Sequence, residues 1–160
     1  MPLTNFPNGI TVEGETIRVS NTTTFSADMS STTLNTIASH EIATVTGLVR
    51  MRIIPDVTEG LSGNTATIAL GTADSTAEFI GATTASGLDT GEIWTTSTPG
   101  ANNKSSVRFE KIPDFVISDA DVGYTIAKSA LITGTLVFRM FWEALEGATS
   151  TVTVGAGGTL

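Results

Sequence analysis

Side chains that commonly carry catalysis are scarce in this chain of 160 residues. It contains no cysteine and a single histidine, His40, so thiol nucleophiles, disulfides and zinc knuckles are excluded. Serine and aspartate are plentiful enough for a serine–histidine–aspartate triad, but no Gly-x-Ser-x-Gly turn is present to expose a nucleophile. We therefore expect His40 to lie at the surface or in a turn, with no catalytic or ligand role.

Two carboxylates, Asp119 and Asp121, stand at alternate positions before Gly123. Calcium loops begin with this spacing, but they take further oxygen ligands from later positions and a final glutamate. Tyr124 and Thr125 follow here instead. The favoured interpretation is a β-turn in which an aspartate side chain caps its own backbone, with no bound metal.

Four other acids lie in predicted loops without fixed spacing: Asp56, Glu59, Asp74 and Glu78. Glycosidases need two carboxylates roughly 5 to 9 Å apart, which is a tertiary property, so a glycan-cleaving enzyme stays open as an alternative. Solvated surface charge is the favoured interpretation. The glycines are scattered at strand ends and are not followed by Lys-Ser or a helix, so we expect no phosphate-binding loop and no cofactor.

Four aromatic side chains offer ring surfaces for a sugar-binding platform: Trp94, Tyr124, Phe141 and Trp142. However, Phe138 and Trp142 fall on one continuously apolar face of a predicted strand, which favours burial in a core. A carbohydrate-binding module or receptor-binding head is therefore the weaker alternative.

The charge balance limits the class of partner. Eight basic and sixteen acidic residues give a net charge of −8, whereas a nucleic-acid partner needs a basic face. No apolar run approaches the roughly 18 residues of a membrane span, and the first residues lack the basic and apolar regions of a secretory signal. We expect no nucleic-acid or membrane partner. The protein is expected to be made in the cytoplasm and used there or carried out by another route, for example in a particle.

Two stretches predict the strands that must position these side chains. Residues 44–54 alternate between apolar and polar types, which predicts a long half-buried strand ended by Pro55. Residues 135–143 form the clearest strand, with an apolar face made of Leu136, Phe138, Met140 and Trp142 and an opposite face made partly apolar by Val137 and Phe141. A strand that is apolar on both faces lies at the centre of a sandwich or against a neighbouring subunit.

The fold class follows from about eight short strands separated by turn signals, with no helical period sustained over a dozen residues. This pattern predicts an all-β protein with less than about a tenth of the chain helical. The first choice is a jelly-roll-like β-sandwich with extended N- and C-terminal arms. We divide the chain into an N-terminal arm with entry strands (1–40), a sandwich body (41–145) and a Gly/Thr-rich C-terminal tail (146–160).

The two terminal segments carry too few large apolar side chains to form a core of their own. Ordering a backbone costs about 1–2 kcal/mol per residue, so contacts elsewhere must offset it. Their short apolar fragments are suited to adding a strand to a neighbour's edge, although the N-terminal fragments pairing within their own sandwich, with a disordered tail, stays open. Together with the outward face of residues 135–143, they give these predicted subunit contacts: Ile10, Val12, Ile17, Val19, Val137, Phe141, Val152 and Val154.

Several stretches resemble tailed-bacteriophage proteins of the head and virion surface. The opening Leu-Thr-Asn-Phe-Pro-Asn-Gly-Ile resembles the start of many such proteins. Four further stretches are similar to small β-rich phage structural proteins, namely residues 50–61, 68–73, 121–124 and 134–145. The ordered set spans most of the predicted body, and the family indicated is that of capsid decoration (cement) proteins and head fibres.

The resemblance implies a jelly-roll or sandwich core, a homotrimer, and extended arms that clamp neighbouring subunits of the major capsid protein. It carries over no catalytic residue. The chain lacks the long repetitive shaft of a fibre, which favours a cement protein. The function expected from the resemblance is therefore that of a structural protein on the outer capsid surface of a virion, which stabilises the shell by bridging capsid subunits, with a head fibre as the alternative.

Overall fold

The computed structural model describes residues 10–12, 15–17, 21–98, 112–146 and 149–160. In this part of the chain every regular element is a β-strand except one short 3-10 helix, Ala85–Gly87. No helix here is long and apolar enough to cross a membrane. The expectation of a nearly helix-free fold is confirmed for the described residues.

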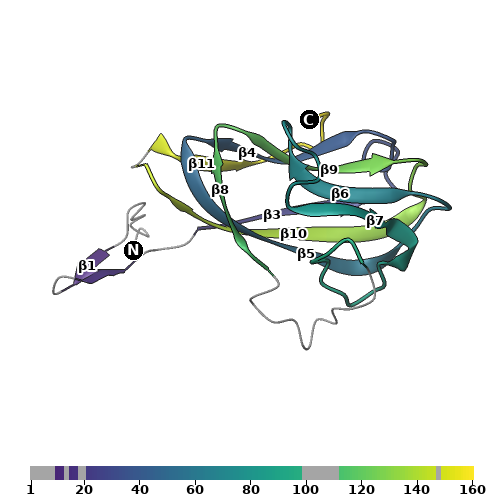
Figure 1. Cartoon of the computed structure of the whole chain (residues 1–160), viewed down its shortest axis with the longest axis horizontal. Helices are drawn as coiled ribbons and strands as arrows, with labels where there is room; N and C mark the ends of the chain where they lie inside the picture. The colour runs from purple at the N-terminus through teal and green to yellow at the C-terminus, as the bar shows by residue number, and fades with distance from the viewer. Residues whose placement is uncertain (1–9, 13–14, 18–20, 99–111, 147–148) are drawn as a thin grey trace.

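Two antiparallel sheets lie face to face and enclose the core (Figure 1). One sheet has four strands, in the order β3 (Asn21–Asp28), β10 (Thr133–Ala144), β5 (Leu48–Ser62) and β8 (Asp114–Ser118). The other has five, in the order β11 (Thr151–Val154), β4 (Ser39–Thr46), β9 (Asp121–Ala127), β6 (Thr67–Thr72) and β7 (Ile80–Thr84). The predicted all-β sandwich is confirmed.

The strand pairing is nested. β3 pairs with β10, β4 with β9, β5 with β8 and β6 with β7. The first strand of this series of eight therefore pairs with the last, and each following strand pairs with the next one inward. Such a chain is a long hairpin folded over so that its two halves contribute neighbouring strands to both sheets. β11 extends the five-stranded sheet beside β4.

The predicted single strand over residues 44–54 is wrong in its bounds. Gly47 has φ of +70°, a conformation that glycine adopts at little cost, and it separates β4 from β5. β5 then continues through Pro55 to Ser62. The carbonyl oxygen of Pro55 accepts a 2.9 Å hydrogen bond from the Trp94 amide, so the missing amide hydrogen lies on the side away from β10 and costs that pairing nothing.

β10 lies between β3 and β5 and contributes three fully buried side chains to the core. Leu136, Phe138 and Met140 are fully buried on its inner face, and the Phe138 ring lies parallel to Tyr124 with centroids 5.7 Å apart. Burying each such side chain contributes about 1.5–3 kcal/mol. The prediction that residues 135–143 form an internal strand is confirmed.

The sandwich begins earlier in the chain than the expected boundary at residue 41. Residues 21–28 form β3, an edge strand of the four-stranded sheet, and they bury Phe25 and Ala27. The threonines of this strand obscured its role, because they outnumber the two buried side chains and make the sequence read as an entry segment.

The C-terminal segment folds back on its own sheet. Val152 of β11 lies opposite Val45 of β4 and is buried. Beyond β11, the Glu41 amide donates to the Gly158 carbonyl oxygen at 2.8 Å, and the Leu160 amide donates to Ser39 at 3.1 Å. The expectation of a C-terminal arm is therefore wrong for residues 151–160, because their alternating fragment completes the edge of their own sheet.

The N-terminal strands pair only with each other. β1 (Ile10–Val12) and β2 (Glu15–Ile17) form a two-stranded antiparallel sheet with Ile10 opposite Ile17. Figure 1 shows this hairpin beyond the end of the sandwich at which β3 begins. Among the described strands, β1 and β2 are the two that belong to neither of the stacked sheets.

Candidate functional site

His40 is a buried residue of β4, so the expectation of a surface or turn position is wrong. Its ring stacks on Tyr124 with centroids 5.0 Å apart, and its Nε2 lies 3.1 Å from the Thr36 carbonyl oxygen. Within the described ranges no serine or acidic side chain forms a hydrogen bond with it. The structure therefore places His40 in the core without assembling a triad around it.

The sequence predicted an aspartate that caps the backbone of its own turn. Asp119 instead caps the backbone of a neighbouring turn. Its Oδ1 accepts a 2.7 Å hydrogen bond from the Gly47 amide, and its own φ of +45° places it in the left-handed region that aspartate tolerates. The two turns at this end of the sandwich are thereby joined. The described residues contain no group of three or more acidic or histidine side chains that could hold a metal ion.

The four acids without fixed spacing lie in two different parts of the fold. Asp56 and Glu59 belong to β5, where Asp56 is buried beside Arg139 and Glu59 accepts a hydrogen bond from Thr135. Asp74 and Glu78 are exposed in the connection between β6 and β7. The two on β5 therefore have partners within their own sheet.

The large aromatic side chains are mostly internal. Trp94 and Tyr124 are fully buried, and the Trp94 indole nitrogen donates to the Thr83 hydroxyl at 2.9 Å. Trp142 is half-buried, with its indole nitrogen bonded to Thr23 at 3.1 Å. The described residues thus give little support to the sugar-platform alternative, which needs exposed tryptophan or tyrosine.

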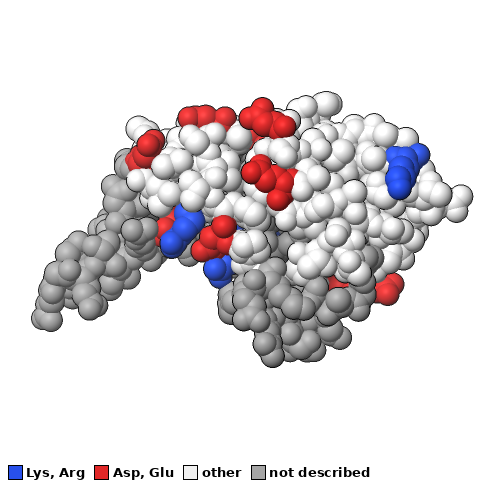
Figure 2. All heavy atoms as spheres, viewed as in Figure 1, with Lys and Arg blue, Asp and Glu red and all other residues white. Residues whose placement is uncertain are grey.

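The outer surface of the four-stranded sheet has a distinct composition. In the described part of the chain arginine occurs at three positions, and all three lie on this surface, which we call the arginine face. Each guanidinium pairs with a carboxylate on an adjacent strand: Arg50 with Glu143 at 2.8 Å, Arg52 with Asp114 at 2.7 Å and Arg139 with Asp56 at 3.3 Å. Figure 2 shows that acidic groups elsewhere on the visible side are spread out with few basic ones.

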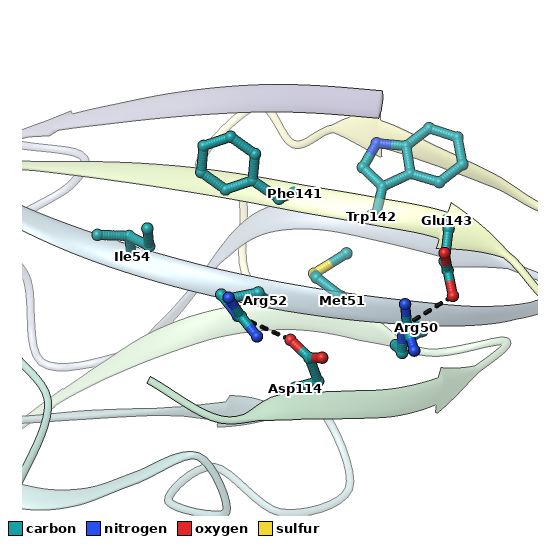
Figure 3. A pocket seen from close by; sticks show the side chains of 8 residues that line it. All are labelled: Arg50, Met51, Arg52, Ile54, Asp114, Phe141, Trp142 and Glu143. Carbon is teal, nitrogen blue, oxygen red and sulfur yellow. Dashed lines mark hydrogen bonds and ion pairs between the residues drawn. The ribbon is translucent and has the colours of Figure 1, made fainter. Parts of the chain in front are cut away.

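A groove of about 360 Å³ crosses the arginine face between β5 and β10. Figure 3 shows Arg50 and Arg52 on the same strand, with Arg50 directed to Glu143 on β10 and Arg52 to Asp114 on β8. Phe141 lines the groove and is 37% exposed. The side chain of Glu143 is 10% exposed and that of Arg50 is 46% exposed, so the acid anchors an arginine whose outer part faces solvent.

The structure separates the eight predicted subunit contacts into three groups. Val137 and Phe141 lie on the arginine face, where Phe141 is exposed and Val137 is half-buried. Val152 packs inside its own sandwich, whereas Val154 is 48% exposed at the end of β11. The remaining residues belong to the N-terminal segment: Ile10, Val12 and Ile17 lie on the hairpin strands, and Val19 lies outside the described residues.

The arginine pairs were missed from the sequence. Arg50 and Arg52 are visible there as the polar face of an alternating strand, but their partners lie on strands that are far away in the chain. Cross-strand register decides which acid meets which arginine, and that register depends on the tertiary pairing of β5 with β10 and β8.

Comparisons with known proteins give no family. No family model, curated protein or solved structure matches the chain. We therefore infer the function from the residues and geometry of this chain, together with the resemblance of its segments to phage head proteins.

Proposed function

We propose that this protein is a structural component of a virion that binds the outer surface of a capsid and stabilises the shell by bridging neighbouring major capsid protein subunits. In this proposal it acts as a homotrimer, without a cofactor and without catalysis. The observation that carries it is the arginine face, where exposed Phe141 lies beside arginines that are already held by acids. The resemblance to capsid decoration proteins supplies the identity of the partner.

The arginine face has the chemistry of a protein-binding surface. Arginine and aromatic side chains are enriched at interface centres. Arg50 and Arg52 are oriented by Glu143 and Asp114, so fewer rotamers must be frozen when a partner binds. Many copies attached across seams would then reinforce the shell through multivalent contacts.

The net charge is compatible with a position outside the shell. A chain with a net charge of −8 gains nothing from the phosphate backbone of packaged DNA. The paired charges on the arginine face allow it to contact another protein without presenting an excess of either sign. A head fibre would share this attachment and differ in projecting away from the surface.

Co-sedimentation with purified capsids that lack this protein tests the proposal. We expect Phe141→Ser to weaken binding about tenfold or more, because it removes the exposed apolar group at the groove. Ile132→Ser is the matched control, since Ile132 is 65% exposed and lies outside the arginine face, just before β10 begins. Capsids that bind neither the full chain nor the control would contradict the proposal, and so would undiminished binding of Phe141→Ser.

A further inference from the structure

The N-terminal hairpin is incomplete as a folded unit. β1 and β2 have no third strand among the described residues, and an isolated two-stranded hairpin is marginally stable in water. Two of the three residues of β1, Ile10 and Val12, are apolar. The hairpin therefore has a free edge to offer.

The edge of β8 is unpaired in a complementary way. β8 pairs with β5 on one side and ends the four-stranded sheet on the other. The Leu145 amide bonds to Leu48 on the β10 side, whereas Pro55 and Val57 bond to the segment at residues 91–94 on the β8 side. The hydrogen-bonding groups of successive residues point to alternate sides of β5. The N–H and C=O groups of Val49 and Met51 therefore point toward β8, where their register partners are Ile117 and Phe115.

It follows that the backbone N–H and C=O groups of Val116 point away from β5. No hydrogen bond from the described residues reaches its amide or carbonyl group on that side. The Val116 side chain is 65% exposed. Natural sheets usually protect such an edge, so an open one beside an apolar residue is a template for an added strand.

A groove of about 370 Å³ runs along this edge. Its lining on β8 includes Phe115 and Ile117 together with the polar residues Asp114 and Ser118. Phe79 and Glu78 line it from the connection between β6 and β7, and the Phe79 ring contacts that of Phe115 with centroids 4.2 Å apart. A strand added to β8 places alternate side chains toward this groove.

We propose that β8 of one copy receives β1 from a second copy, so that the hairpin extends the neighbour's four-stranded sheet. This inference rests on the proposed function for the number of copies. A contact between two different surfaces is head-to-tail, and it closes into a ring when the rotation permits. Three copies would form the homotrimer.

The hairpin of the same chain is poorly placed to fill this edge. β3 follows the hairpin and lies at the opposite edge of the sheet, with β10 and β5 between it and β8. At about 4.8 Å per strand, a strand beside β8 lies about 19 Å from β3. Four residue steps join Ile17 to Asn21 and span at most about 14 Å, which is less than 19 Å, so the hairpin of the same chain is too far from this edge to pair with it.

Light scattering on the full chain in solution, without capsids, tests the inference. We expect a mass of about 50 kDa, three times 16.6 kDa. Val116→Pro should reduce the mass to that of one chain, because it removes the outward amide without touching the amides of residues 115 and 117 that pair with β5. Val116→Thr keeps this amide and should remain associated.

A matched proline variant checks that the effect belongs to β8. The Gly155 amide bonds to Ile42, so the neighbouring residue Val154 faces the free edge of β11, and Val154→Pro should leave the mass unchanged. Dissociation of Val154→Pro to the same extent as Val116→Pro would overturn the assignment to β8. A full chain with the mass of one copy would overturn it outright.

Mixing two full-length variants provides the decisive comparison. Ile10→Asp combined with Val12→Asp spoils β1 without altering the sandwich, and Val116→Pro spoils β8. Each should be monomeric alone, and together they should form a complex of two chains, since one retains an acceptor edge and the other a donor strand. The inference fails if the hairpin variant stays associated alone or if the mixture does not combine.

The outcome is separable from that of the proposed function. A monomeric chain that still co-sediments with capsids removes this inference and leaves the proposed function standing. A chain that associates through β1 and β8 but ignores capsids does the reverse.

Discussion

The hydroxyl of Tyr124 on β9 donates a 2.8 Å hydrogen bond to the carbonyl oxygen of Leu34, in the connection between β3 and β4. The ring is fully buried between His40 and Phe138, with centroids 5.0 Å and 5.7 Å away. Tyr124 thus ties the loop that crosses between the two sheets to the centre of the core.

The ionisation of this tyrosine gives the first prediction. Burial raises the pKa of the Tyr124 hydroxyl well above its ordinary value, because the phenolate is disfavoured away from water. Tyr124 is the only tyrosine, so near-ultraviolet tyrosinate absorbance reports it alone. The folded protein should show none at about pH 10, where the unfolded chain titrates.

The sign of the effect on stability follows from the raised pKa. The contribution of neutral Tyr124 is complete below the unfolded value of about 10 and is lost as the pH rises toward the folded value. Urea unfolding at increasing alkaline pH should therefore show falling stability. A folded-state absorbance titration centred near 10 would contradict the burial of the hydroxyl.

The second prediction concerns the buried pair of Trp94 and Thr83. Thr83→Val leaves the indole N–H, which now donates to Thr83 at 2.9 Å, without its partner in the core. An unsatisfied buried donor costs about 1–3 kcal/mol, and urea denaturation should show a loss of that size. Thr84→Val is the control, because Thr84 is exposed on the same strand and should change stability by less than about 0.5 kcal/mol.

The third prediction concerns the attachment of the C-terminal segment. A Cβ at Gly123 would overlap the His40 carbonyl oxygen and the Leu160 side chain. Gly123→Ala should therefore displace residues 155–160 and cost about 1–3 kcal/mol as an overpacked site. Limited proteolysis should remove the C-terminal segment faster from this variant. Gly158→Ala meets nothing within 4 Å, and equal sensitivity of the two variants would contradict the account.

The fourth prediction concerns an exposed turn. Two hydrogen bonds from Ser30 to Asp28 Oδ1 lower the pKa of the Asp28 carboxyl. The larger effect comes from the Ser30 hydroxyl at 2.7 Å and the smaller from the Ser30 amide at 2.9 Å. The contribution of these hydrogen bonds to stability is present at pH above the ordinary pKa of aspartate and is lost as the pH falls through the lowered pKa of Asp28. Ser30→Ala should raise this pKa in an NMR titration. Ser31→Ala should not, since that hydroxyl contacts Thr33.

Alternating sequence patterns predicted the centre of the fold and failed at its connections. Residues 135–143 became the inner strand β10 because their period of two matches a buried sheet face. The pattern at 44–54 continues in phase across Gly47, so it could not show that the chain changes sheets there. β3 escaped recognition because its buried residues are few and its threonines many.

The site was less predictable than the fold. Phe141 was identified because it is apolar on the polar side of a strand, whereas the pairing of Arg50 with Glu143 depends on strand register. His40 was expected at the surface because its neighbours in sequence are polar. It is buried because β4 turns its side chain inward onto Tyr124.

Electron microscopy of the source particle tests the central claim most directly. The account predicts density for this sandwich on the outer capsid surface, over seams between capsid subunits, with the arginine face around Phe141 turned toward the shell. Density for the chain confined to the tail, or its absence from the capsid surface, would contradict the account.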